Sequence, residues 1–133
     1  MNKRYFVSSL FVFLFITVFE WIFHGIFLKD LYVQTSYLWR PEDQFIMPAM
    51  LLGQFSFAFI FSFIFVKGYE NKGMIEGIRY GLLIGLLFIP SQLVMYAVQP
   101  LPANLVILWS VGGLVELAIA GAILAATYRT WKR

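Results

Sequence analysis

Four long apolar stretches dominate this sequence of 133 residues. A helix needs about 20 mostly apolar residues to cross the hydrocarbon layer of a membrane. The stretches that reach this length run roughly over residues 5–28, 45–66, 75–97 and 103–128. The connections between them are too short to form a second domain. The sequence therefore predicts an all-α fold, a single transmembrane domain over residues 1–133 built as a bundle of four membrane-spanning helices.

The composition agrees with a membrane protein, because 61% of the residues are hydrophobic, 13% are charged and the mean hydropathy is +0.80. A soluble domain is about half apolar and about one quarter charged. Phenylalanines alternate from Phe55 to Phe65 with the period of a strand. An open strand leaves its backbone unpaired in lipid, however, so we expect a helix with phenylalanine around its circumference. The absence of cysteine excludes disulfides and cysteine-ligated metal centres.

Lys3 and Arg4 precede the first apolar stretch, as basic residues do in a signal peptide. This stretch is too long for a signal peptide, lacks a small-residue cleavage site and carries Glu20 and His24. We therefore expect it to be retained as the first membrane helix.

The basic residues predict the orientation of the chain. With the amino terminus in the cytoplasm, only Lys29 and Arg40 lie outside. The other basic residues then all lie inside: Lys3, Arg4, Lys67, Lys72, Arg79, Arg129, Lys132 and Arg133. We expect both termini in the cytoplasm. The net charge of +3 is then a topology signal and an attraction to anionic lipids, and it gives no support to a nucleic-acid partner.

Ionisable side chains inside membrane helices are costly, and they are by default candidates for function. Three qualify here: Glu20, His24 and Glu116. Glu20 and His24 are four residues apart and share one helix face. At about 1.5 Å rise per residue, Glu116 falls near the midplane and His24 roughly 10 Å further out. Gln54 and Gln92 fall in the same outer half, so side chains from all four helices would form one polar intramembrane site.

The chemistry of such a site stays open between four alternatives. A histidine with two carboxylates suits a divalent cation, although one histidine at a loose spacing provides few ligands. The carboxylates would equally suit a proton relay or an organic cation. A structural role needs only Glu20 paired with His24 and Glu116 bonded to Gln54. The single histidine also suits a b-type haem or a quinone, so the metal and the cofactor remain unassigned.

Glycines recur every four residues on the third stretch, at Gly73, Gly77, Gly81 and Gly85. Such a stripe lets another helix approach closely, either within the bundle or in a homodimer or larger membrane complex. The motifs of soluble enzymes are missing. Gly68 and Gly73 have the spacing of a phosphate-binding loop, but Met74 stands where that motif needs lysine. We therefore expect no enzymatic activity.

Four segments resemble an uncharacterised family of small four-span bacterial membrane proteins. They are HGIFLKDLY from His24, YLWRPED from Tyr37, FVKGYENKGMIEGIRYGLLIGL from Phe65 and VELAIAGAILAATYR from Val115. The resemblance extends over nearly the whole chain and is most specific in KGYENKGMIEGIRYG. It implies a bacterial inner membrane and no particular substrate. It also implies that the family pattern includes Glu20, His24, Arg40, Pro41, Glu70, Glu76, Arg79 and Glu116.

Two functions follow as hypotheses. The first is a non-enzymatic accessory or interaction subunit with a polar intramembrane site. The second is a small homo-oligomeric transporter or ion pathway that uses the buried glutamates and histidine.

Overall fold

The computed structural model describes residues 1–130, and every regular element in this range is helical. The elements are α1 (Lys3–Ile22), the π-helix η1 (Phe23–Phe27), α2 (Lys29–Gln34), the 3-10 turns η2 (Ser36–Leu38) and η3 (Glu42–Gln44), α3 (Met47–Lys67), α4 (Met74–Val98) and α5 (Ala103–Thr130). Within residues 1–130, four segments are long and apolar enough to cross a membrane: Lys3–Phe27, Met47–Lys67, Met74–Val98 and Ala103–Arg129. The predicted fold class is confirmed, and the chain is a multi-pass membrane protein.

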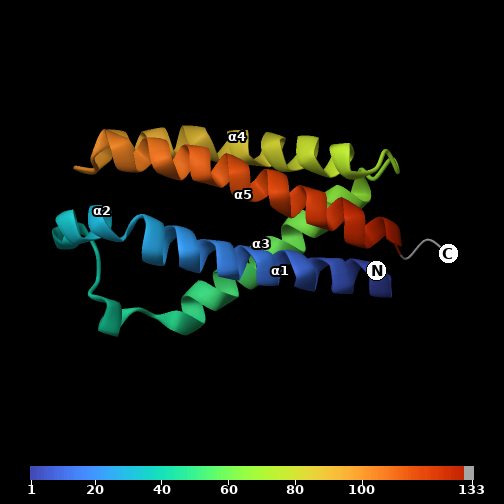
Figure 1. Cartoon of the computed structure of the whole chain (residues 1–133), viewed down its shortest axis with the longest axis horizontal. Helices are drawn as coiled ribbons and strands as arrows, with labels where there is room; N and C mark the ends of the chain where they lie inside the picture. Colours follow the sequence, from blue (N-terminus) through green and yellow to red (C-terminus); the bar gives the residue numbers. More distant parts are fainter. Residues whose placement is uncertain (131–133) are drawn as a thin grey trace.

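The helices form two pairs that meet through α1 and α5 (Figure 1). α4 and α5 lie side by side along their length, while α3 crosses α1 at an angle. α1 also packs on α5, whereas α3 and α4 make little backbone contact with each other. The amino terminus, the α3–α4 loop and the end of α5 lie at one end of the bundle, which we call the termini end. The opposite end carries α2 and the α4–α5 turn, and we call it the α2 end.

Glycine explains the close contact between α4 and α5. A Cβ atom added to Gly81 would lie 1.8 Å from the carbonyl oxygen of Leu117, and one added to Gly77 would lie 2.0 Å from that of Gly121. At Gly85 an added Cβ atom would meet a side chain instead, at 3.0 Å from Cδ2 of Leu114. The stripe is therefore a contact within the bundle, and α5 of the same chain occupies the surface that a homodimer through these glycines would need.

Gly73 departs from this pattern. It lies at the start of α4 with a φ of +83°, a conformation that favours glycine, and a Cβ atom added to it would lie 3.3 Å from the Arg129 side chain. The prediction that Gly73 belongs to the helix-packing stripe is corrected accordingly. Gly73 continues the four-residue spacing of the stripe in the sequence, but it does not lie on the helix, because α4 begins at Met74.

The loop before α4 is held by one carboxylate. Glu76 accepts hydrogen bonds from the backbone N–H groups of Glu70 at 2.6 Å and Lys72 at 2.7 Å. Asn71 between them has a φ of +63°, which turns the two N–H groups toward the same side. A carboxylate near a helix start also interacts favourably with the helix dipole.

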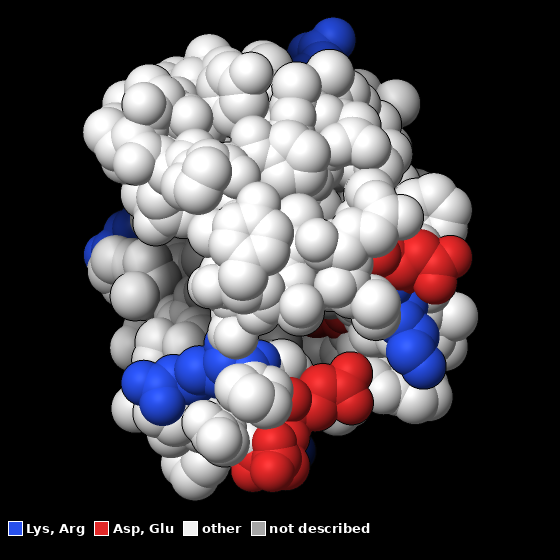
Figure 2. Space-filling model, turned by 90° about the vertical axis from the view of Figure 1, so that its left-hand side faces the viewer, with Lys and Arg blue, Asp and Glu red and all other residues white. Residues whose placement is uncertain are grey.

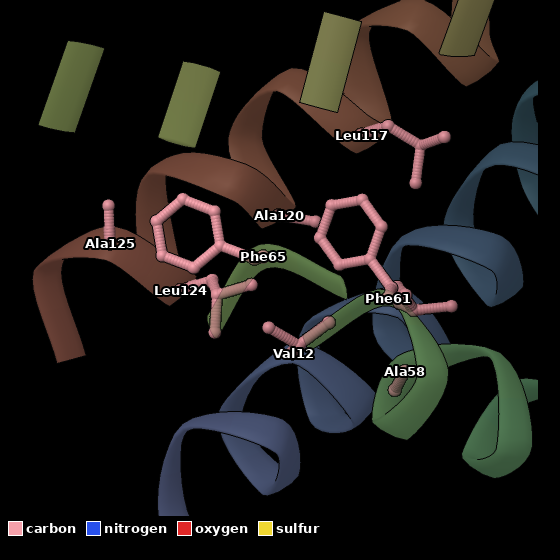
Figure 3. Packing of buried hydrophobic residues seen from close by; sticks show 9 residues of the cluster. Val12, Ala58, Phe61, Phe65, Leu117, Ala120, Leu124 and Ala125 are labelled. Carbon is pink, nitrogen blue, oxygen red and sulfur yellow. The ribbon is translucent and has the colours of Figure 1, made fainter. Parts of the chain in front are cut away.

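An apolar core fills the half of the bundle nearer the termini end (Figure 3). Phe61 and Phe65 of α3 point toward α5, and Val12 of α1 packs in the same cluster. Tyr80 of α4 packs on both phenylalanines and donates a hydrogen bond to the carbonyl oxygen of Phe61 at 2.6 Å. The buried cluster consists of Val12, Ile16, Ala58, Phe61, Phe65, Leu117, Ala120, Leu124 and Ala125.

Charged residues are distributed unequally between the two ends. The α2 end, seen in Figure 2, carries acidic and basic side chains over the α1–α3 connection and almost none over the α4–α5 turn. Those of the connection are Lys29, Asp30, Arg40, Glu42 and Asp43. The termini end carries Lys3, Arg4, Lys67, Lys72, Arg79 and Arg129, while Lys132 and Arg133 lie outside the described residues.

Candidate functional site

A cavity of about 500 Å³ lies in the half of the bundle nearer the α2 end. All four long helices contribute to its wall. The polar residues singled out in the sequence all line it: Glu20, His24, Gln54, Gln92 and Glu116. Its volume is within the range of small-molecule sites in proteins, and most of its lining is apolar.

The end of α1 places the first two of these residues. Glu20 lies on regular α-helix, and His24 follows on the π-helix η1, which closes with a hydrogen bond of 2.9 Å from Leu28 N–H to the Phe23 carbonyl. Glu20 and His24 still face each other, with 3.1 Å between Oε2 and Nε2. Short π-helices are often found at functional sites, where they redirect a side chain.

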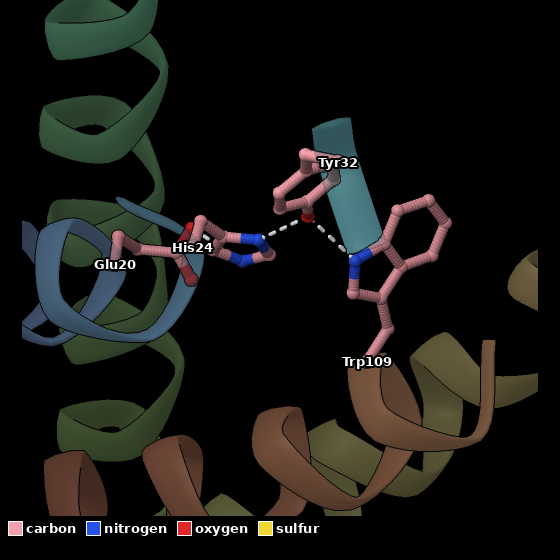
Figure 4. Close-up of polar contacts among 4 residues, drawn as sticks. All are labelled: Glu20, His24, Tyr32 and Trp109. Carbon is pink, nitrogen blue, oxygen red and sulfur yellow. Dashed lines mark hydrogen bonds and ion pairs between the residues drawn. The ribbon is translucent and has the colours of Figure 1, made fainter. Parts of the chain in front are cut away.

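Two aromatic residues extend this pair into a hydrogen-bonded chain (Figure 4). His24 Nδ1 lies 2.5 Å from the hydroxyl of Tyr32 on α2, and the indole N–H of Trp109 on α5 donates to the same hydroxyl at 2.8 Å. Burial raises the pKa of Tyr32 to about 12, so its hydroxyl stays protonated at neutral pH. A neutral His24 would then accept from Tyr32 at Nδ1 and donate from Nε2 to Glu20.

The chain continues inward from Glu20 to Glu116. The two carboxyl groups are within hydrogen-bonding range of each other. Since a carboxylate can only accept, a hydrogen bond between them requires one shared proton. Glu116 is only 8% exposed, and no N–H or hydroxyl of the described residues donates a hydrogen bond to it.

The two glutamines are fixed by hydroxyl groups. Thr17 donates to Gln54 Oε1 at 3.1 Å, and Ser110 donates to Gln92 Oε1 at 2.7 Å. In each case the amide oxygen is engaged and the NH₂ group makes no hydrogen bond within the described residues. The cavity wall therefore offers both carboxyl acceptors and amide donors to a guest molecule.

The cavity is open, and its opening follows from the poor contact between α3 and α4. Near the cavity, the aromatic rings of Phe57 on α3 and Phe88 on α4 bridge this gap at 5.7 Å. The side chains of Glu20 and His24 are 31% and 34% exposed, although they lie on a membrane-spanning helix. On the side toward the termini end, the apolar core closes the cavity.

Sequence reasoning missed Tyr32, Trp109 and Ser110 as parts of the site. Trp109 lies seven residues before Glu116, which is two helical turns, so helical periodicity would have placed both on one face of α5. In the sequence, Tyr32 is recognisable only as an aromatic residue at a membrane interface. The helical periodicity of α1 does not continue through the π-helix, so it could not place Tyr32 beside His24.

Metal binding finds little support in the geometry. Among the described residues, no group of three or more His, Asp or Glu side chains surrounds a common point as metal ligands would. Glu20 lies between His24 and Glu116 in a linear chain, which suits proton sharing better than coordination. No residue set in the described part of the chain singles out a haem or another cofactor.

The chain was compared with known protein families, with curated proteins and with solved structures, and no match was found in any of them. The resemblance to small four-span bacterial membrane proteins therefore stays a prediction.

Proposed function

We propose that this protein is a non-enzymatic membrane protein that binds a membrane-soluble molecule in the cavity between α3 and α4. The observation that carries the proposal is an open cavity of about 500 Å³ at membrane depth with ionisable groups in its wall. A purely structural Glu20–His24 pair would be expected to be sealed between helices, since exposed polar groups are costly in lipid.

The proposal includes an orientation. With both termini in the cytoplasm of a bacterium, the basic termini end faces inward, which follows the usual excess of Lys and Arg on that side. The cavity then lies in the outer half of the inner membrane. As an accessory subunit, the protein would receive its guest from the outer leaflet, and a partner would use surfaces other than the glycine face of α4.

Two glycines allow the cavity to be filled without disturbing the helices. Gly53 and Gly113 line it, and a Cβ atom added to either would contact nothing within 4 Å. Gly68 has the same open surroundings but lies outside the cavity, at the termini end. Gly113→Leu is therefore the test variant and Gly68→Leu its matched control.

The experiment is native mass spectrometry of protein purified with its membrane lipids. We expect a bound molecule on the wild type and on Gly68→Leu, and its loss from Gly113→Leu. Equal occupancy of Gly113→Leu would contradict binding in the cavity, and so would a wild type that carries nothing.

A second function, proton-coupled transport, is favoured by the chain Tyr32–His24–Glu20–Glu116, whose neighbours are in hydrogen-bonding contact. Such a chain passes protons between a membrane interface and the membrane interior. In liposomes, Glu116→Gln should abolish pH-coupled flux without unfolding the bundle. Glu42→Gln, on the exposed connection, is the control, and flux that survives in Glu116→Gln would contradict transport through this site.

A further inference from the structure

We propose that the guest of the cavity is a lipophilic organic monocation, taken up in exchange for one proton. This inference rests on the proposed binding function and adds the chemical class of the guest. It follows from the charge and the lining of the cavity.

The charges in the cavity are acidic and have no fixed basic partner. Its titratable groups are Glu20 and His24 from α1 and η1 and Glu116 from α5, with Tyr32 of α2 bonded to His24. α3 and α4 contribute only the uncharged amides of Gln54 and Gln92. None of the described lining residues is Lys or Arg. An anionic guest would therefore meet carboxyl groups with no fixed positive charge to hold it.

Charge neutrality sets the stoichiometry. A net charge is costly in a cavity at membrane depth, so the empty site is neutral only when its two carboxyl groups and imidazole together bind two exchangeable protons. With a monocation present, neutrality requires one proton less. One proton therefore leaves for the solvent for each cation bound, and no bond other than that to the proton is broken.

The lining selects an organic cation over an inorganic one. Hard metal cations need six or more oxygen ligands in a close shell, and the cavity wall is mostly apolar. Aromatic side chains line it from four helical segments, η1, α3, α4 and α5: Phe23, Phe57, Phe88 and Trp109. The faces of such rings attract organic cations, most strongly where water is excluded.

The test uses two probes of the same shape and opposite charge, tetraphenylphosphonium and tetraphenylborate. Their binding to the full chain in detergent micelles is measured by calorimetry, and specific binding is the saturable part that Gly113→Leu abolishes and Gly68→Leu retains. We expect the phosphonium to bind at least about tenfold more tightly than the borate. Its Kd should fall about tenfold per pH unit, because one proton is released per cation.

A double variant tests the role of the carboxyl groups. Glu20→Gln with Glu116→Gln should remove both the preference for the cation and the pH dependence, while Glu42→Gln with Glu70→Gln changes neither. Because amides of the same shape fill the same space, the double variant should elute and unfold like the wild type. If the double variant does not fold like the wild type, the pH dependence of the Kd of the folded wild type tests the exchange of one proton for one cation.

Each contrary outcome has a separate meaning. Specific binding of the borate as tight as that of the phosphonium, or a Kd that does not change with pH, overturns the cation assignment. If Gly113→Leu still displaces a co-purifying molecule, the cavity function survives that result. If neither probe shows specific binding and Gly113→Leu displaces nothing, the inference and the proposed function both fail.

Discussion

Tyr32 lies on α2, and its side chain links the α1–α3 connection to the polar site at membrane depth. Its hydroxyl is shared by His24 Nδ1 and the Trp109 indole. Tyr32→Phe would leave both nitrogens without this partner, and the loss of one such hydrogen bond costs about 0.5–1.5 kcal/mol. We expect a lower free energy of unfolding in detergent. Tyr37→Phe is the control, because Tyr37 is 73% exposed and its hydroxyl makes no hydrogen bond to a described residue.

The pH dependence of this effect has a definite sign. Burial raises the pKa of Tyr32 from its ordinary value of 10 to about 12, so the folded state holds the proton more tightly than the unfolded chain. The stabilisation is fully present below pH 10 and is lost as the pH rises toward 12. The difference in unfolding free energy between wild type and Tyr32→Phe should shrink over this range. A difference that stays constant would contradict the burial of Tyr32.

The α4–α5 hairpin depends on backbone contact at Gly81. The Cβ atom of Gly81→Ala would lie 1.8 Å from the Leu117 carbonyl oxygen, so the helices would have to separate. Overpacking of this kind costs about 1–3 kcal/mol, more when backbone is displaced. We expect a clear fall in thermal stability. Gly113→Ala on α5, where a Cβ contacts nothing within 4 Å, should be neutral or slightly stabilising, and an equal fall in both variants would argue against the close approach.

The α3–α4 loop depends on Glu76. The Glu70 and Lys72 amides donate to different oxygens of Glu76, so Glu76→Gln removes one of these hydrogen bonds and takes the charge from the other, and hydrogen bonds to a charged group contribute about 1.5–3 kcal/mol each. We expect faster hydrogen exchange at residues 70–73. Glu70→Gln breaks only an exposed ion pair with Lys72 and should change exchange little. Unchanged exchange in Glu76→Gln would show that the loop keeps its shape without the carboxylate.

The sequence predicted the elements well and their mutual rotation poorly. Length and apolarity determine where a helix crosses a membrane, so residues 45–66 predicted α3 to within two residues at either end. The polar residues were recognised because a charge at membrane depth is costly. That Glu20 and Glu116 share one cavity depends on how each helix is rotated about its axis, and helix length does not determine this. The stripe at Gly77 and Gly81 was compatible with a helix of the same bundle or of a second copy of the chain, and the fold identifies α5 of the same chain as the contacting helix.

At the scale of the whole molecule, the cavity opens between α3 and α4 in the half nearer the α2 end, and the apolar core separates it from the termini end. The chain contains no cysteine, so a single introduced thiol reports its own position without background. We expect Gly113→Cys in membrane vesicles to react with a membrane-impermeant thiol reagent added from the α2 side.

Gly68→Cys at the termini end should react only from the opposite side. This control establishes which face of the vesicle each reagent reaches. Reaction of Gly113→Cys from the Gly68 side would mean that the core does not close the cavity. No reaction from either side would mean that water does not enter it.

The contact between α1 and α5 has a consequence for biosynthesis. In the described residues, three connections and the helices α3 and α4 separate α1 from α5 along the chain, and Glu20 on α1 meets Glu116 on α5. During translation, α1 enters the membrane long before α5 has been made, so the nascent chain holds an incomplete acidic pair until α5 is inserted. α4 and α5 are neighbours in sequence and can pair as soon as both emerge. The site therefore forms only after α5 has been inserted, and a chain that stops before α5 has no site at all.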